Sequence, residues 1–242
     1  MSGFIDLHCH YVPGVDDGVP DVAEGLSLCR ELAALGYVRA VSTPHIRRGL
    51  FDNDAAGLQR AFASLQHAAR EQPQGLPQLD LSAEHHFDSL FWELSETGGL
   101  LPYPGDKALL IEFAYEGFPV GVERQIFRLA LLGYTPVLAH PERYKAVFKR
   151  SDTLEPLLRQ GVCAQLDVMS LTGHYGRAPR KAAERLLDEG AYGVACSDAH
   201  RARDVPEVGK AIDLLIRRAG EQEAQRLLQD NPDRLLRGLP PR

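Results

Sequence analysis

Residues 4–10 read FIDLHCH, an apolar run that ends in two histidines, His8 and His10. A helical pattern, DVAEGLSLCRELAALG, follows at residues 21–36. Short, mostly apolar runs that alternate with helices are typical of parallel strands buried on both faces. Because residues two apart on a strand share a face, we expect both imidazoles at one end of the first strand and on the same side of it.

The same unit, a strand followed by a helix, recurs seven times along the chain. The six later strands are expected in YVRAVSTPH, QLDLSAEH, ALLIEFAYE, TPVLAHPE, GVCAQLDVM and YGVACSDAH. Seven such units predict a distorted (β/α)7 barrel of the TIM type, with a doubly wound open sheet as the alternative fold. No linker marks a boundary, so residues 1–242 are expected to form one domain, in which the tail NPDRLLRGLPPR ends the last helix and then frays.

The composition is that of an ordinary globular protein, with 44% hydrophobic and 25% charged residues. The formal net charge of -6 disfavours binding to nucleic acid or to an acidic membrane surface. No apolar run approaches the roughly 20 residues that span a bilayer, and the first residues lack the pattern of a signal peptide. We therefore expect a cytoplasmic protein without membrane insertion.

The cysteines Cys9, Cys29, Cys163 and Cys196 are scattered and form no CxxC pair, which disfavours a structural zinc site. Buried free thiols are the expected state. Cysteine phosphatases carry an arginine six positions after the nucleophile, but Ala202 stands six after Cys196, and the other cysteines lack the arginine as well. A cysteine nucleophile is therefore disfavoured.

Every expected strand ends in a residue type that can bind a metal ion. In chain order these residues are His8 and His10, His45, Glu84, Glu112, His140, Asp167, and Asp198 with His200. In a barrel the carboxyl ends of the strands form one rim, where active sites lie. Clustered carboxylates repel one another unless cations separate them. Mixed imidazole and carboxylate ligands suit manganese, iron or zinc, and so many of them predict two or three divalent metal ions.

Several motifs together resemble the polymerase and histidinol phosphatase (PHP) superfamily. They are HCH, VDDG, TPH followed by RRGLF, AEHH, LIEF, HPERY, SLTG and SDAH, and they span residues 5–200 in the family's order. The resemblance is closest to the bacterial branch of manganese-dependent protein-tyrosine phosphatases that accompany tyrosine autokinases in capsule and exopolysaccharide synthesis. It implies hydrolysis of phosphotyrosine on a protein, with a membrane-associated tyrosine kinase as the partner.

Carried over residue by residue, the resemblance implies a centre of three metal ions. The implied ligands are His8, His10, Asp17, His45, Glu84, Glu112, His140, Asp198 and His200. A hydroxide that bridges the metals would attack phosphorus directly. Arg143 would contact the phosphate through paired hydrogen bonds, and Arg47 and Arg48 would lie near the substrate. Catalytic roles fall to Arg143, Asp198 and His200, while the identity of the general acid stays open.

Other polar residues near these motifs have two interpretations. The family more often has Asn where this chain has Asp167, which either ligates a metal or forms hydrogen bonds beside the site. His174 either contacts the substrate or belongs to a surface loop. Asp16 is expected to form hydrogen bonds in its loop, and Asp6 to orient the neighbouring histidines.

Three further histidines need a separate explanation. His85 and His86 follow Glu84 directly, and at least one of them is expected to be structural. His67 lies within an expected helix and is interpreted as a solvated surface residue.

Three other functions compete with a tyrosine phosphatase. A small-molecule phosphatase, for example of histidinol phosphate, would use the same metals with a different pocket. An exonuclease is disfavoured by the acidic charge and by the absence of any other polymerase sequence. A non-catalytic metal-binding module of the same fold would normally have lost ligands, whereas all nine positions are filled here.

Overall fold

A computed structural model describes residues 3–242, so Met1 and Ser2 of the expected domain lie outside the described residues. Its strands pair in parallel throughout and form two sheets, with the orders β1-β2-β4 and β3-β5-β6-β7-β8-β9. The strands are β1 (Phe4–Cys9), β2 (Tyr37–Ser42), β3 (His45–Ile46), β4 (Gln78–Leu81), β5 (Glu84–His86), β6 (Ala108–Glu112), β7 (Thr135–Ala139), β8 (Cys163–Asp167) and β9 (Tyr192–Cys196).

Two of the seven expected strands are each divided in two. The second becomes β2 and β3, and the third becomes β4 and β5. Pro44, which has no N–H to donate to a sheet, stands at the first break. Across the breaks the two runs stay side by side, because Ser82 N donates to Ser42 O and Glu84 N donates to Thr43 O. The break distorts the barrel and leaves its sequential order intact.

The first and last strands are joined beyond the end of β9. An isolated parallel bridge connects Cys9 with Ala199, and His10 N donates to Ala199 O at 2.9 Å. Asp198 N likewise donates to His8 O at 2.9 Å. These bonds bring the carboxyl ends of β1 and β9 together, so the expected α/β barrel architecture is confirmed in its distorted form.

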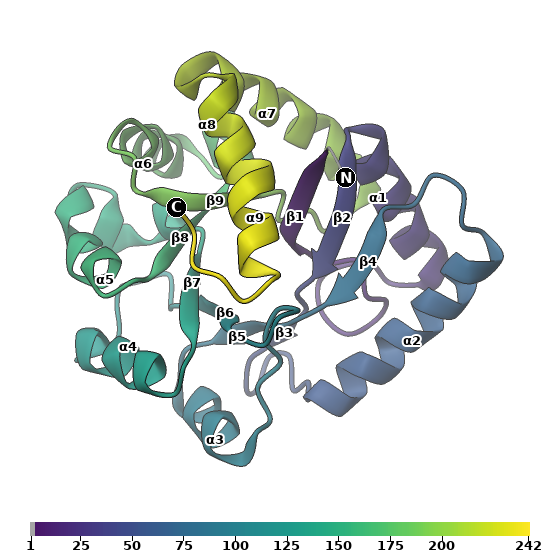
Figure 1. Ribbon diagram of the computed structural model, residues 1–242, viewed down its shortest axis with the longest axis horizontal. Coiled ribbons are helices and arrows are strands. Elements are labelled where there is room, and N and C mark those ends of the chain that lie inside the picture. Colours follow the sequence, from purple (N-terminus) through teal and green to yellow (C-terminus); the bar gives the residue numbers. More distant parts are fainter. Residues whose placement is uncertain (1–2) are drawn as a thin grey trace.

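Helices surround the strands (Figure 1). They are α1 (Val22–Ala34), α2 (Ala55–Glu71), α3 (Ser89–Thr97), α4 (Val122–Leu131), α5 (Glu155–Arg159), α6 (Arg177–Asp188), α7 (Val205–Ala219), α8 (Glu221–Gln225) and α9 (Asn231–Leu235). The first three long helices begin after an aspartate whose side chain accepts a hydrogen bond from a first-turn N–H, namely Asp21, Asp54 and Asp88. Within residues 3–242, no helix combines the length and the apolar character needed to cross a membrane.

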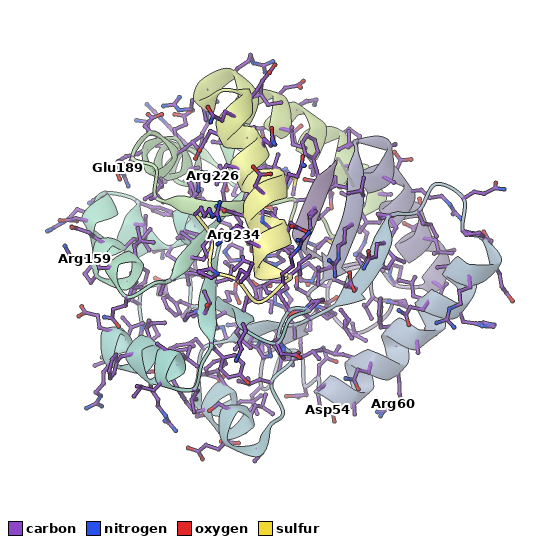
Figure 2. The ribbon with its side chains drawn as sticks, in the orientation of Figure 1. Asp54, Arg60, Arg159, Glu189, Arg226 and Arg234 are labelled. Carbon is purple, nitrogen blue, oxygen red and sulfur yellow. The ribbon has the colours of Figure 1, made fainter. Side chains whose placement is uncertain are left out.

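The C-terminal tail is packed, and the prediction that it frays is wrong. Asn231 is buried, and its amide donates to Gly193 O at 2.7 Å and to Arg242 O at 3.0 Å. Arg242 N donates back to the Asn231 side chain at 2.8 Å. Figure 2 shows the labelled residues Arg226 and Arg234 beside this returning segment, and both donate to carbonyl groups of the tail. Backbone groups that a frayed tail would leave to water are therefore paired.

The tail also completes a buried apolar cluster inside the barrel. Besides Leu235 and Leu236, this cluster contains Ile5, Leu7, Val41, Tyr103, Ala108, Leu110, Val137, Ala139, Cys163 and Val194. Its members come from β1, β2, β6, β7, β8 and β9, which places it in the interior that these strands enclose. In Figure 1 the segment from α8 to α9 crosses the middle of the view, in front of the strands.

Leu235→Ala should therefore lower the free energy of unfolding by about 2–5 kcal/mol, because it removes buried apolar surface and leaves a cavity. Leu239→Ala is the matched control, since Leu239 lies in the same tail but is 46% exposed. We expect the control to change stability by less than about 0.5 kcal/mol. Urea unfolding at a fixed metal concentration measures both variants, and equal changes would contradict the packed tail.

Candidate metal centre

All nine expected metal ligands lie together at one rim of the barrel. Four overlapping groups hold them, and within each group one ligand atom per residue lies within 4.8 Å of the others. The groups are His10, Asp17, His45 and His200; His8, His10 and Asp198; His8, Glu84 and His140; and His45, Glu84 and Glu112. Residues shared between groups make the four groups parts of one centre.

Glu84, at the start of β5, lies in the middle of this centre and is 1% exposed. One oxygen, Oε2, lies 3.1 Å from His8 Nε2 and 3.0 Å from His45 Nδ1. The other, Oε1, lies 3.1 Å from His140 Nε2. A carboxylate with a different imidazole set at each oxygen is a natural bridge between two cations.

Asp198 and His140 hold their positions with backbone angles that are rare for residues other than glycine. Their φ angles are +48° and +33°. Backbone strain of this kind concentrates at functional sites. It aims Asp198 Oδ1 into the centre, 3.2 Å from His8 Nε2 and 3.3 Å from His10 Nε2.

Two buried atoms at this point favour a cation. Among the described residues, His10 Nε2 and Asp198 Oδ1 form no hydrogen bond of good geometry, although they lie 3.3 Å apart. A buried polar atom without a partner costs free energy, and a bound cation would satisfy both atoms at once. The donor set is therefore consistent with metal binding.

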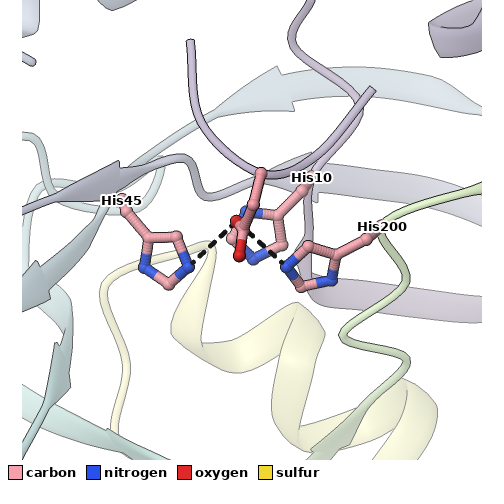
Figure 3. Close-up of side chains that lie close together, drawn as sticks. His10, His45 and His200 are labelled. Carbon is pink, nitrogen blue, oxygen red and sulfur yellow. Dashed lines mark ion pairs between the residues drawn. The ribbon is translucent and has the colours of Figure 1, made fainter. Parts of the chain in front are cut away.

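The open side of the centre is formed by Asp17 and its imidazole neighbours (Figure 3). Asp17 Oδ1 lies 3.5 Å from His45 Nε2 and 3.4 Å from His200 Nε2, and the Asp17 side chain is 57% exposed. The rings of His10 and His200 stack with centroids 4.1 Å apart. This part of the centre faces solvent, so a substrate can approach it.

In the absence of cations, His8, His45 and His200 take up protons. Burial favours the neutral ring of His8, but the carboxylates of Glu84 and Asp198 outweigh it and raise its pKa to about 10. Burial also lowers the pKa of His45 and His200, but nearby carboxylates outweigh it. Glu84 above all raises the pKa of His45 to about 9, and Asp17 and Asp198 raise the pKa of His200 to about 9. A site whose carboxylates attract protons this strongly is electrostatically suited to divalent cations.

Hydrogen bonds on the far side of two rings direct their Nε2 atoms into the centre. His10 Nδ1 lies 2.8 Å from Asp16 Oδ2, and His8 Nδ1 lies 2.9 Å from Gln165 Oε1. Asp16 also accepts from His45 N at 3.1 Å, so it connects two ligand-bearing segments. Partners of this kind fix the tautomer and orientation of metal-binding histidines. Sequence reasoning missed Gln165, although an amide inside an apolar strand two residues before Asp167 is a usable signal.

Asp6 contributes in a different manner from the one expected. Its Oδ1 accepts from His8 N and Ser197 N, and its Oδ2 accepts from Ser197 Oγ at 2.5 Å. Burial raises the pKa of Asp6 to about 6. Asp6 therefore fixes the backbone of β1 and of the segment before Asp198, and within residues 3–242 it accepts no hydrogen bond from an imidazole.

Two of the remaining histidines have roles outside the centre. His85 Nδ1 lies 3.0 Å from Leu110 O, its Nε2 accepts from Leu101 N, and burial lowers its pKa to about 4, so it is a neutral structural residue. His67 is 77% exposed and lies 3.5 Å from Glu71, as expected for a surface residue.

His86 lies at the edge of the centre, with Nδ1 3.5 Å from Glu112 Oε2. This distance places it behind a candidate ligand, where it can orient the carboxylate.

Arg143 reaches the centre from the turn that follows β7. Its Nη1 donates to Asp198 Oδ2 at 2.6 Å and lies 3.6 Å from Asp167 Oδ2. Asp167 is fully buried, accepts from Met169 N, and belongs to none of the four ligand groups. Its placement agrees with hydrogen bonding beside the site.

An open pocket of about 260 Å³ lies over this part of the rim. The residues that line it are Asp17, Arg143, Met169, His174, Tyr175, Asp198, His200, Arg201, Arg203 and Asp204. The structure does not bring Arg47 or Arg48 to this pocket, and Arg48 instead donates to Glu93 at 2.6 Å on the surface. The pocket adds Arg201 and Arg203, which sequence reasoning did not single out.

All four cysteines are free and buried, as expected. Burial raises the pKa of each thiol, to about 12 for Cys163. None of them lines the pocket, so a thiolate nucleophile has no place in it.

The sequence matches the family described as capsular polysaccharide synthesis, CpsB/CapC, over residues 4–237. Tyrosine-protein phosphatase YwqE of Bacillus subtilis (strain 168) is 29% identical over 234 residues, which cover 96% of this chain and 91% of YwqE.

Solved structures give the same relationship. Crystal structures of YwqE from Bacillus subtilis and CpsB from Streptococcus pneumoniae, described as unique metal-dependent tyrosine phosphatases, are similar with a TM-score of 0.86 at 28% identity, covering 97% of this chain and 95% of that chain. The phosphotriesterase homology protein from Escherichia coli, complexed with phosphate in its active site, has a TM-score of 0.60 at 13% identity, covering 96% and 97%. This second likeness shows the fold alone.

The resemblance inferred from the motifs is thereby confirmed at the level of the family. Because the match extends over residues 4–237 of 242, the chain belongs to the CpsB/CapC family of capsular polysaccharide synthesis.

Proposed function

We propose that this chain is a metal-dependent protein-tyrosine phosphatase that hydrolyses the phosphate monoester of phosphotyrosine in a protein. The observation that carries the proposal is the convergence of nine imidazole and carboxylate side chains beside an arginine at one rim. The activity named for the relative YwqE supports the same reaction class. One domain, residues 1–242, would contain the whole site.

The four ligand groups would hold two or three divalent metal ions, for which manganese is our first candidate and iron or zinc the second. When bound, such ions lower the pKa of a coordinated water and place positive charge beside the phosphoryl oxygens. Glu84 and Asp198 are the carboxylates best placed to contact more than one ion, because each lies near imidazoles of different groups.

Arg143 would bind the phosphoryl group directly. Its Nη1 is held by Asp198, whereas within residues 3–242 its Nε and Nη2 form no hydrogen bond. A guanidinium fixed at one nitrogen can present its other donors to two phosphoryl oxygens. These donors would stabilise the negative charge that the phosphoryl oxygens carry during transfer.

His200 would act at the open edge of the site. Its Nδ1 lies 2.9 Å from Asp198 O, which fixes the ring, and its side chain is 28% exposed beside the pocket. The phenolate of tyrosine needs little protonation, since its pKa is only about 10.

The carboxylate of Asp198 serves the reaction by holding Arg143 and by contacting the centre.

As the partner we propose a membrane-associated tyrosine kinase of capsule or exopolysaccharide synthesis. The compartment we propose is the cytoplasm. The alternative substrate is a small phosphate monoester such as histidinol phosphate. An open pocket with an exposed edge favours a side chain presented by a protein.

The metal premise predicts that dialysis against a chelator abolishes phosphotyrosine hydrolysis and that added Mn²⁺ restores it. Because His8, His45 and His200 have pKa values of about 9 to 10 without cations, they hold protons at pH 7 that a metal must displace. Titration calorimetry of the metal-free protein in two buffers of different ionisation enthalpy should detect protons released, and metal affinity should rise with pH up to about 10. Full activity after exhaustive chelation would refute the premise.

Arg143→Ala should lower kcat/KM on a phosphotyrosine peptide by about 10- to 100-fold, since it removes charge-assisted hydrogen bonds to the phosphoryl group. Arg159→Ala is the matched control, because Arg159 pairs with Glu155 on α5 at the outer edge of the molecule (Figure 2). Steady-state kinetics at saturating Mn²⁺ measures both. Unchanged kinetics in Arg143→Ala would refute the assignment.

Substrate class is tested by comparing kcat/KM for a phosphotyrosine peptide and for histidinol phosphate under the same conditions. We expect the peptide to be preferred by at least about tenfold, which corresponds to about 1.4 kcal/mol of transition-state binding. Preference for histidinol phosphate would favour the alternative substrate while leaving the metal centre intact.

A further inference from the structure

We propose that Tyr175 is a positioning residue for Arg143. The Tyr175 ring holds the guanidinium of Arg143 in the orientation that receives the phosphoryl group. The inference rests on the proposed function, because it concerns the arginine assigned there to phosphate. The guanidinium carbon of Arg143 lies 4.3 Å from the centre of the Tyr175 ring, within the range of a cation–π interaction.

Arg143 needs such support because, among the described residues, its hydrogen bond and ion pairs involve only Nη1. Nη1 lies 2.6 Å from Asp198 Oδ2 and 3.6 Å from Asp167 Oδ2. A guanidinium held at one nitrogen between two carboxylates is free to tilt about that contact. A ring against its face removes this freedom and leaves the remaining N–H groups in a defined plane.

Tyr175 is itself held by a tight loop. Gly173 and Gly176 flank the loop with φ angles of +87° and +100°, which residues with a side chain rarely adopt, and Gly176 N donates to Gly173 O at 2.8 Å. The rings of His174 and Tyr175 pack edge to face, with centroids 4.8 Å apart and an interplanar angle of 78°. The aromatic ring is therefore placed by the backbone and by a neighbouring side chain.

The segments that carry the two residues are joined through Glu142. Its fully buried carboxylate accepts from Asp167 N, from Ser170 Oγ and from Tyr192 OH at 2.9–3.0 Å. Glu142 precedes Arg143 in the 3-10 turn Pro141–Arg143, and Ser170 belongs to the 3-10 segment Val168–Thr172 that leads to Tyr175. The arginine and the ring are thus fixed relative to each other.

Burial raises the pKa of the Tyr175 hydroxyl, and the carboxylates of Asp167 and Asp198 raise it further. The ring is therefore a neutral phenol beside the cation, and its face is what Arg143 contacts. Phenylalanine keeps this face and removes the hydroxyl together with its contact to Asp167, so it is the conservative variant for the experiment.

Tyr175→Leu should lower kcat/KM on a phosphotyrosine peptide by on the order of tenfold and raise the inhibition constant of inorganic phosphate by a similar factor. Tyr175→Phe should stay within about threefold of the parent in both measurements. Trp92→Leu is the matched control, since it removes a ring that lies 4.5 Å from another arginine, Arg128, between α3 and α4. It should leave both constants unchanged at saturating Mn²⁺.

A double-mutant cycle with Arg143→Ala separates positioning from a general structural effect. In that background, Tyr175→Leu should cause no further change in kcat/KM or in phosphate inhibition. Equal losses with and without Arg143 would overturn the inference. An unchanged Tyr175→Leu variant beside an impaired Arg143→Ala variant would also overturn it, and this result would leave the proposed function standing. An Arg143→Ala variant with full activity would overturn the phosphate role of Arg143, and the role of Tyr175 with it.

Discussion

The buried carboxylate of Glu84 is the constraint on which the rest of the rim depends. A carboxylate that is 1% exposed must be compensated, and three imidazoles from three strand ends, His8, His45 and His140, lie within 3.1 Å of its oxygens. Their position fixes where the strands must end relative to one another. The interruption between β4 and β5 immediately precedes Glu84, so the distortion of the barrel and the position of this buried carboxylate belong to the same local feature.

The same requirement explains why the site is rigid on the inside and open on the outside. The inner histidines are oriented by Asp16 and Gln165, and Asp6 ties β1 to the segment that carries Asp198. Asp17 and His200, in contrast, face solvent. An arrangement of this kind keeps the inner ligands in place while a large substrate, such as a loop of another protein, meets the outer ones.

Much of the architecture follows from the sequence because strands and helices alternate strictly, and the carboxyl ends of parallel strands must share one rim. For this reason eight of the nine candidate ligands could be predicted from the strand ends, although they lie as far as 192 positions apart, from His8 to His200. The ninth, Asp17, lies in a loop and was implied only by the resemblance to the family. Partners that depend on how side chains pack were not recognisable. Gln165 is a polar residue in an apolar strand, but the sequence does not show that its partner is His8. The contact of Tyr175 with Arg143 requires a loop whose course two glycines determine. The packed tail was missed because its polar, proline-containing sequence does not show that Asn231 pairs with the carbonyl group of Gly193 and with the N–H of Arg242.

The burial of every cysteine has a consequence for the conditions under which such a protein can work. Oxidants attack the thiolate, and susceptibility follows thiolate character and exposure. Here burial raises the pKa of all four thiols, and none faces the pocket. We expect a phosphatase built in this way to keep its catalytic activity in peroxide and alkylating agents that inactivate cysteine-dependent enzymes. Its activity should instead depend on the supply of divalent metal in its surroundings.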